Sequence, residues 1–206
     1  MIAQMLPIVS HSFTGEFRLQ HNMLTGSIPT QVGGMTALTV WESSDNQGDG
    51  DIPTEFGSLV NLVTLDLAEM GLRGSLMTEF GQLKALQSLS LSDNYIHGPM
   101  PTELGSMVAI QSLLLNQNAI AGAIPSEISQ LRELTALYLQ DNNLTGEVPG
   151  ALAACEKLIS VDLSGNELLG QMPDEICSLR QAGLKTMISD CAIQCSIPSC
   201  CSSCTP

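Results

Sequence analysis

The sequence predicts an α/β repeat protein in which similar coils of 24 residues stack in single file as a solenoid. Three columns of residues, each recurring every 24 positions, carry this prediction. Glycine makes up only 18 of 206 residues, so its unbroken recurrence in one register far exceeds chance. The glycine column is Gly26, Gly50, Gly74, Gly98, Gly122, Gly146 and Gly170. The asparagine column is Asn22, Asn46, Asn94, Asn118, Asn142 and Asn166, and the proline column is Pro29, Pro53, Pro101, Pro125, Pro149 and Pro173.

The first element expected in each coil is a short parallel β-strand. Its signal is a pair of apolar residues two positions apart, because alternate residues of a strand point to the same face. The pairs are Phe17 and Leu19, Leu65 and Leu67, Leu89 and Leu91, Leu113 and Leu115, Leu137 and Leu139, and Val161 and Leu163. Stacked coils would join these pairs into one continuous core.

A turn follows each strand, and the asparagine, glycine and proline columns explain its shape. An asparagine side chain carries both a donor and an acceptor, so an inward-pointing one can satisfy backbone groups of adjacent coils that lack a ladder partner. Glycine suits a conformation that a Cβ would forbid, and proline fixes φ where no ladder hydrogen bond is needed. We therefore expect a structural asparagine ladder, followed in each coil by an extended stretch and a loose 3₁₀ or helical segment.

The copies "LKALQSLSLSDNYIHGPMPTELGSM" (83–107) and "LRELTALYLQDNNLTGEVPGAL" (131–152) follow the pattern LxxLxLxxNxLxGxIPxxLGxL, which resembles the plant-type leucine-rich repeat. The resemblance implies a curved, right-handed solenoid of about seven coils, with a parallel β-sheet on the concave face and 3₁₀ or short helices on the convex face. It also implies similarity to the ectodomains of receptor-like proteins and to inhibitor proteins of this family. The predicted domains are an incomplete N-terminal coil or cap remnant (1–13), seven repeats (14–180) and a cysteine-rich C-terminal cap (181–206).

One repeat breaks two columns at once, with Met70 in place of asparagine and Met77 in place of proline. By the ladder argument, the coil of Met70 leaves buried backbone groups short of a partner, so Met70→Asn is expected to stabilise the chain. The preceding repeat, residues 38–59, is expected to be the weakest coil. It places Trp41 and Ser43 at the apolar pair, and Gly48 stands where leucine usually lies.

Seven cysteines favour an oxidising compartment. Cys155 occupies an apolar column, which predicts a buried free thiol. The other six lie where the array must close its last exposed core, and a disulfide-stapled cap resembles those of secreted or cell-surface leucine-rich repeat proteins. The disulfide candidates are Cys177, Cys191, Cys195, Cys200, Cys201 and Cys204. Fifteen pairings remain open, and a zinc site is the disfavoured alternative, because the cysteines lack a nearby histidine and paired CxxC motifs.

The acidic net charge of the chain limits the classes of partner that it can be expected to bind. With 7 basic and 21 acidic residues the net charge is −14, which argues against nucleic acid or an anionic membrane and favours a cationic ligand. No run approaches the roughly 18 apolar residues of a transmembrane helix, and the start "MIAQMLPIVSHS" lacks the regions of a signal peptide. We nevertheless expect an extracellular or cell-surface protein with a truncated N-terminus. The oligomeric state, and any transmembrane helix or kinase in a longer parent, stay open.

The concave face is the expected binding surface, because residues alternating with the buried pair project from it in register. Acidic side chains dominate there, beside an apolar leucine and tyrosine, which suits a basic peptide or protein segment. The candidate ligand-binding residues are Arg18, Glu42, Asp45, Asp66, Glu69, Ser90, Asp93, Leu114, Tyr138, Asp141 and Asp162. The alternatives are that these side chains only solvate an acidic chain, and that the protein is a structural surface or wall protein without a specific ligand.

No catalytic, metal or cofactor site is predicted. The three histidines fall in different coils or columns, and none lies near a serine or cysteine in a way that suggests a nucleophile and base. The stretch "DNQGDGD" (45–51) is weakly similar to a calcium loop, but Phe56 stands where the loop needs a bidentate glutamate. Asn143 begins the sequon Asn-Leu-Thr and is a candidate N-glycosylation site.

Overall fold

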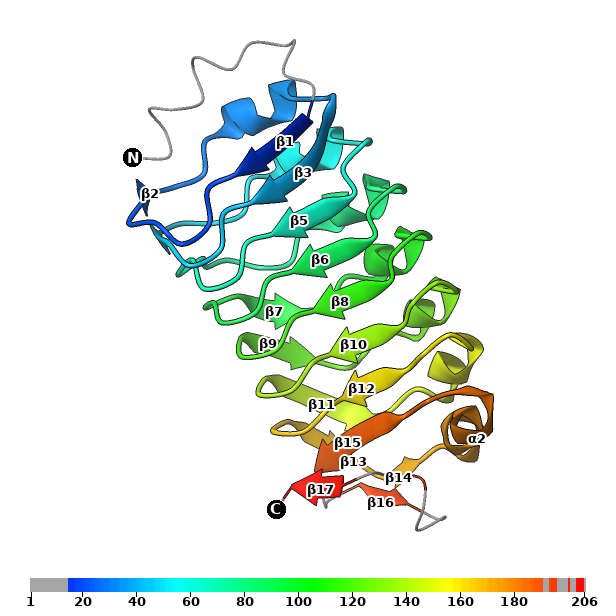
Figure 1. Ribbon diagram of the computed structural model, residues 1–206. Coiled ribbons are helices and arrows are strands. Elements are labelled where there is room, and N and C mark those ends of the chain that lie inside the picture. The colour runs from blue at the N-terminus through cyan, green and yellow to red at the C-terminus, as the bar shows by residue number, and fades with distance from the viewer. Residues whose placement is uncertain (1–14, 191–192, 196–199, 201–202, 206) are drawn as a thin grey trace.

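The computed structural model describes residues 15–190, 193–195, 200 and 203–205, which form a single-file stack of coils (Figure 1). The first domain predicted, residues 1–13, lies outside the described residues. A nine-stranded parallel sheet runs the length of the stack and forms the concave face. Its strands, in spatial order, are β1 (Gly15–Arg18), β3 (Leu38–Glu42), β5 (Thr64–Asp66), β6 (Ser88–Ser90), β8 (Ser112–Leu114), β10 (Ala136–Tyr138), β12 (Ser160–Asp162), β15 (Thr186–Asp190) and β17 (Ser203–Thr205).

The 24-residue period is visible directly in the strand pairing. Leu65 pairs with Leu89, Leu89 with Leu113, and Leu113 with Leu137, so equivalent residues of successive coils lie side by side. This register confirms the repeat predicted from the sequence. Between β12 and β15 the offset grows to 26 residues, because Val161 pairs with Met187.

A second parallel sheet lies on the opposite side of the core, and it was not predicted. The extended stretches after the asparagine turns pair with one another in the order β13-β11-β9-β7. These strands are β7 (His97–Pro99), β9 (Ala119–Gly122), β11 (Asn143–Glu147) and β13 (Glu167–Leu169), and two further two-stranded pairs flank them, β2 (Thr25–Gly26) with β4 (Gln47–Gly48) and β14 (Gln171–Met172) with β16 (Gln194–Cys195). On this side of the core, the coil between β4 and β7 has no named strand, and isolated bridges join Asp51 to Arg73 and Ser75 to His97.

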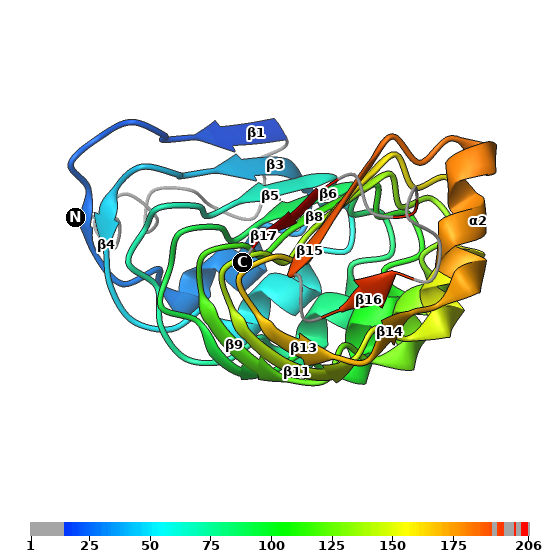
Figure 2. The ribbon, with the colours of Figure 1, turned by 90° about the horizontal axis from the view of Figure 1, so that it is seen from below.

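Short helices close each coil along a third side (Figure 2). A proline precedes most of them, and its carbonyl accepts the first 3₁₀ hydrogen bond, as when the Phe56 amide donates to Pro53 at 3.1 Å. The helices are η2 (Thr30–Gly34), η3 (Thr54–Ser58), η4 (Thr78–Gln82), η5 (Thr102–Ser106), η6 (Ser126–Gln130), η7 (Gly150–Ala154) and α2 (Asp174–Ala182). Among the described residues no helix is long and apolar enough to cross a bilayer.

The core is one continuous cluster of leucine, isoleucine, valine, methionine and phenylalanine that runs through the stack. Near the N-terminal end aromatic rings replace leucines. Trp41 lies with its ring centroid 4.5 Å from Phe17 and 5.4 Å from Phe56. Because each coil contributes only one layer of this core, a single coil could not bury its apolar face alone.

The asparagine ladder is present and joins adjacent coils through one side chain. The Asn94 amide nitrogen donates to the carbonyls of Leu67 and Leu91 at 2.9 and 3.0 Å. Its oxygen accepts from the amides of Met70 and Leu72 at 3.2 and 2.9 Å. Asn46, Asn118, Asn142 and Asn166 make equivalent bonds to carbonyls two, three and 27 residues earlier. Asn22, in the first coil, is exposed, and among the described residues its side chain donates only to the carbonyls of Leu19 and Gln20 in its own turn.

Met70 fills space that the preceding coil leaves empty. Its side chain is fully buried, and its sulfur accepts a hydrogen bond from the Ser43 hydroxyl at 3.0 Å. Its methyl group packs over Gly48, where a Cβ would lie 3.0 Å from the Met70 Cε. Met70 therefore compensates for two missing apolar side chains, and the carbonyls of Ser43 and Leu67 each retain one asparagine donor. This packing predicts the opposite effect of asparagine at position 70 from the one that the ladder argument predicts, and the stabilising effect of asparagine stays an untested expectation.

The C-terminal end of the array is closed by side-chain contacts and a disulfide. Asp190 accepts hydrogen bonds from the amides of Gly165 and Asn166 at 2.7 and 3.0 Å, in the place that backbone carbonyls take in earlier coils. Cys177 on α2 is bonded to Cys200, which supports the predicted stapled cap. Cys191 and Cys201 lie outside the described residues. Cys195 and Cys204 lie on β16 and β17, where only the backbone is described.

Glycines of the 3₁₀ helices allow successive helices to stack closely, and this generates a first prediction. A Cβ on Gly105 would lie 2.3 Å from the Glu127 carbonyl oxygen, so Gly105→Ala must push η5 away from η6. We expect it to lower the free energy of unfolding by about 1–3 kcal/mol, the usual cost of overpacking. Gly34→Ala is the matched control, because a Cβ there meets nothing within 4 Å. Equal melting temperatures for the two variants in circular dichroism would contradict the prediction.

The packing of Met70 generates a second prediction. Met70→Asn should lower the free energy of unfolding by about 2–3 kcal/mol, because the shorter side chain leaves a cavity beside Ser43 and Gly48. Met70→Leu keeps most of the volume and should cost less than about 1.5 kcal/mol. Urea unfolding of both variants measures the difference. An asparagine variant as stable as the parent would show that the ladder contacts outweigh the packing.

Candidate functional site

The outward-facing residues of the concave sheet form a column in register across seven strands. Arg18 pairs with Glu42, Glu42 with Asp66, and the register continues through each later strand. The complete column is Arg18, Glu42, Asp66, Ser90, Leu114, Tyr138 and Asp162. The structure thus brings these candidate binding residues together on one surface.

The N-terminal end of this column is occupied by its own ion pairs. The Arg18 guanidinium donates to Glu16 at 2.9 Å and also pairs with Glu42. These hydrogen bonds to Glu16 and Glu42 raise the pKa of Arg18. Gln20 also donates to Glu42, at 3.1 Å. Arg18 and Glu42 therefore largely neutralise each other on the surface.

Two acidic members of the column are held by hydrogen bonds within the fold. Asp66 accepts from the Ser44 hydroxyl at 2.7 Å and from the Ala68 amide at 3.2 Å. Asp162 accepts from both the hydroxyl and the amide of Ser164, at 2.7 and 3.1 Å. Each carboxylate orders the residues just after its strand, so its presence does not by itself indicate a ligand.

The middle of the concave face is less charged. Ser90, Leu114 and Tyr138 are half-buried and adjacent across β6, β8 and β10. The Tyr138 hydroxyl donates to the Ser160 hydroxyl at 3.1 Å, which fixes the ring over the neighbouring strand. Leucine and tyrosine here form an accessible apolar strip on a scaffold that does not need them for its core.

The residue before each asparagine-column position adopts a left-handed backbone conformation. Its φ lies between 53° and 58° in six coils and is 67° at Gly165. Such a φ is uncommon outside glycine, and aspartate is among the residues that tolerate it best. The residues are His21, Asp45, Glu69, Asp93, Gln117, Asp141 and Gly165. Local backbone geometry thus accounts for part of the acidity of this column.

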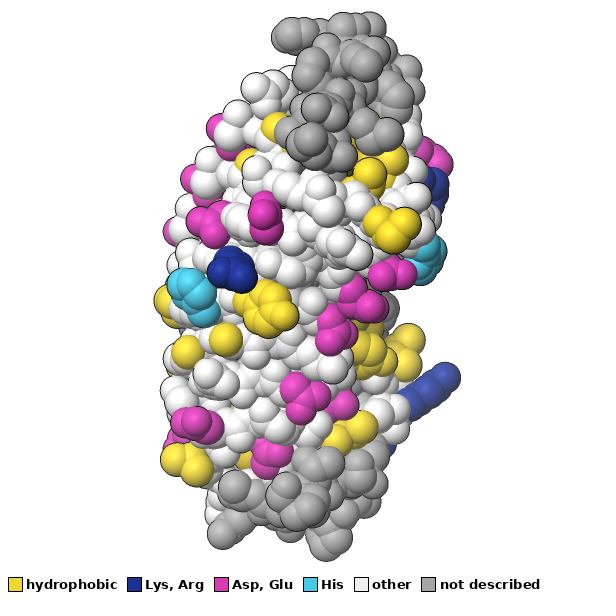
Figure 3. All heavy atoms as spheres, turned by 90° about the vertical axis from the view of Figure 1, so that its left-hand side faces the viewer, with side chains coloured by type: hydrophobic (Ala, Val, Ile, Leu, Met, Phe, Trp, Pro, Cys, Tyr) yellow, Lys and Arg dark blue, Asp and Glu magenta, His cyan; other side chains and the backbone are white. Residues whose placement is uncertain are grey.

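The column forms an exposed ridge at the ends of the concave strands. Acidic side chains extend along this side of the molecule (Figure 3). Asp45 is partnered, because its carboxylate lies 3.0 Å from the Nδ1 atom of His21. Within the described residues, Glu69, Asp93 and Asp141 make no side-chain hydrogen bond or ion pair with the rest of the protein. These three carboxylates are the ones most available to a ligand.

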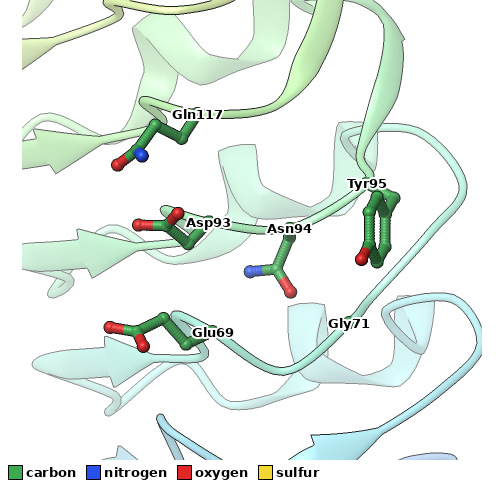
Figure 4. Close-up of a pocket in the computed structure, with 6 residues that line it drawn as sticks. All are labelled: Glu69, Gly71, Asp93, Asn94, Tyr95 and Gln117. Atoms are coloured by element: carbon green, nitrogen blue, oxygen red, sulfur yellow. The ribbon is translucent and has the colours of Figure 1, made fainter.

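A groove of about 430 Å³ lies beside this ridge, and we call it the Tyr95 groove (Figure 4). It is lined by Glu69, Gly71, Asp93, Asn94, Tyr95 and Gln117. Sequence reasoning singled out Glu69 and Asp93 but missed Gly71 and Tyr95. The available signal was the irregular repeat, because Met70 and Met77 mark this coil as one that breaks both the asparagine and the proline columns.

Cys155 is the free cysteine among the described residues. Cys155 is buried, and its thiol donates to the Ile128 carbonyl at 3.3 Å. Burial raises the pKa of this thiol to about 11, so it is protonated at neutral pH. No group of three or more His, Cys, Asp or Glu side chains among the described residues is placed to hold a metal ion.

A family model described as Leucine Rich Repeat matches residues 85–107, 133–155 and 157–179. Among curated protein sequences, none matches significantly. The chain is similar to the plant peptide hormone receptor RGFR1, solved in complex with RGF2, with 39% identity and a TM-score of 0.81 over 85% of this chain. It is also similar to the ectodomain of the receptor kinase GASSHO1/SCHENGEN3 from Arabidopsis thaliana, solved with CASPARIAN STRIP INTEGRITY FACTOR 2 (28% identity, TM-score 0.81, 92% of this chain).

A third similar structure is a plant ice-binding protein, with 29% identity and a TM-score of 0.73 over 86% of this chain. The chain spans only 28%, 24% and 56% of the lengths of these three proteins, respectively. Since proteins with such different ligands share the coil, the fold alone does not identify a ligand.

The sequon generates a third prediction. Asn143 and Thr145 are exposed and lie two residues apart on β11, so both point away from the core. Expression in a eukaryotic secretory pathway should add one N-linked glycan, visible as a mass that endoglycosidase removes. Asn143→Gln and Thr145→Ala should each abolish the added mass, and Asn142→Gln is unsuitable as a control because Asn142 belongs to the ladder. An unmodified wild-type chain after secretion would contradict the assignment.

Proposed function

This chain is a leucine-rich repeat protein of the plant type, and on that premise we propose that it is a non-enzymatic module that recognises a protein or peptide through its concave face. The observation that carries the proposal is the accessible apolar strip of Leu114 and Tyr138 beside the acidic ridge. Neither residue is needed to fill the core, and both lie in register on a rigid sheet. Rigid placement reduces the entropy lost when a partner binds.

The charge of the surface supports a basic ligand. The net charge of the chain is −14, and Glu69, Asp93 and Asp141 stand along the ridge without partners in the described structure. A positively charged segment would approach this face under attraction, at a rate that falls as salt is added. The solved relatives support the same class of partner, since RGFR1 is a peptide hormone receptor bound to RGF2.

We also propose an extracellular or cell-surface location. The Cys177–Cys200 disulfide supports it, because disulfides persist mainly in oxidising compartments. The similar receptor GASSHO1/SCHENGEN3 is a plant membrane receptor kinase solved as its ectodomain. Any membrane attachment of this protein would then come through a segment outside the present chain.

The test is a selection of peptides from a displayed random library against the immobilised chain, followed by affinity measurements on synthetic copies. Enriched peptides should carry excess lysine and arginine, and their binding should weaken with salt. Tyr138→Ala and Leu114→Ala should each weaken binding by about tenfold, a typical loss for an interface anchor. Asp66 is a poor probe because its carboxylate holds Ser44 and Ala68.

Val108→Ala supplies the matched control. Val108 is exposed and follows helix η5, away from the concave sheet, so its truncation should leave affinity unchanged. Binding that is insensitive to Tyr138 and Leu114 would refute recognition by the concave face. Failure to enrich any peptide or protein ligand would favour a structural surface protein without a specific partner.

A further inference from the structure

We propose that the Tyr95 groove is a receptor site for a single arginine or lysine side chain of the bound partner. The proposal deepens the recognition function and rests on it for its biological context. It concerns a surface beside the concave sheet, at the ends of strands β5, β6 and β8, and it assigns a chemical class of ligand to residues outside the central column.

The groove exists because one coil departs from the repeat. Gly71 follows Met70 with a φ of 70°, and it supplies no side chain where Tyr95 stands one coil later. This coil also lies at the gap in the second sheet, where isolated bridges take the place of strand pairing. The fold itself requires glycine here, because its φ is positive and a Cβ would lie 3.0 Å from the Gly48 carbonyl oxygen. The groove therefore follows from local packing, and only its lining points to a ligand.

The two ends of the groove have different chemistry. Figure 4 shows Tyr95 on one side of Gly71 and Asn94, with the side chains of Glu69, Asp93 and Gln117 on the other. Tyr95 is 64% exposed, which is unusual for so large a ring, and the Arg73 guanidinium carbon lies 5.9 Å from the ring centroid. One wall is therefore aromatic, and the opposite wall carries two carboxylates.

A long basic side chain matches this arrangement. Its aliphatic stem can lie across the floor at Gly71 against the tyrosine ring, while its cationic head reaches the carboxylates of Glu69 and Asp93. Those carboxylates make no ion pair with a cation of the described residues, whereas Arg73 already lies over the Tyr95 ring, so the stem of the ligand would pack against the ring beside it. The Asn94 amide is already committed to the carbonyls of Leu67, Leu91 and Ser92, so it acts as a fixed floor.

The experiment titrates the chain with N-acetyl-arginine amide and N-acetyl-lysine amide while amide chemical shifts are followed by NMR. We expect saturable shifts at Gly71, Asn94, Tyr95 and Gln117 at millimolar ligand, the range typical of a single side chain. N-acetyl-citrulline amide, a neutral analogue of arginine, should bind at least about tenfold more weakly, because it cannot form charge-assisted hydrogen bonds. Equal binding of citrulline, or saturable shifts confined to other surfaces, would overturn the proposal.

Variants locate the site. The double substitution Glu69→Gln with Asp93→Asn should raise the dissociation constant by about tenfold, and both side chains keep their size. Tyr95→Ala should also weaken binding. Glu167→Gln is the matched control, because Glu167 is an exposed carboxylate on β13 in the second sheet and does not line the groove, so binding should be unchanged. A dispersed spectrum verifies that each variant is folded, and equal losses in the control and the double variant would show nonspecific attraction to the acidic surface.

The outcome is separable from that of the proposed function. If selected peptides depend on Tyr138 while the arginine amide shows no saturable binding, recognition stands and the groove assignment fails. If the amide binds in the groove but no peptide depends on Tyr138 or Leu114, the groove stands and the concave face is not the recognition surface.

Discussion

The stack depends on one recurring interaction, an asparagine side chain that serves the backbones of two adjacent coils. At the end of each short strand the chain turns, and its carbonyls and amides would otherwise be buried without partners. Asn94 shows the solution, since its amide group bonds carbonyls of two coils and its oxygen accepts two amides. The turn can then remain tight and the apolar layers above and below can meet, which places the concave strands in register.

The coil that contains Ser43 and Gly48 and the coil that contains Met70 depart most from the repeat, and packing between them stabilises both. Where Met70 replaces asparagine, the preceding coil has lost apolar volume at Ser43 and Gly48, and the methionine occupies that volume. The loss of apolar side chains at Ser43 and Gly48 and the gain of a methionine at position 70 are therefore complementary in space. Gly71, which follows Met70 with a φ of 70°, lines the groove on the surface of this coil.

Most of the architecture was predictable from the sequence, because spacing alone determines which residues of successive coils meet. The strand register and the asparagine ladder follow from columns of similar residues, whereas the disulfide-stapled cap was expected from the cysteines clustered at the C-terminal end. The second sheet was not predicted, since β9 and β11 are short and contain alanine, glycine and asparagine beside few strand-forming residues, such as Ile120 and Thr145. The site was only partly visible: the column was identified, but the pairing of Arg18 with Glu42 and the left-handed φ of Asp93 depend on three-dimensional contacts.

The closure of the array by Asp190 has a consequence for how such proteins change length. The Asp190 carboxylate occupies the position where the backbone carbonyls of a further coil would accept hydrogen bonds. It therefore requires only the turn at Gly165 and Asn166 in the coil before it. Coils could then be duplicated or deleted upstream, each lengthening or shortening the molecule by about 4.8 Å, without redesign of the terminus. The contacts of Asp190 would therefore be the same in a protein with more or fewer coils.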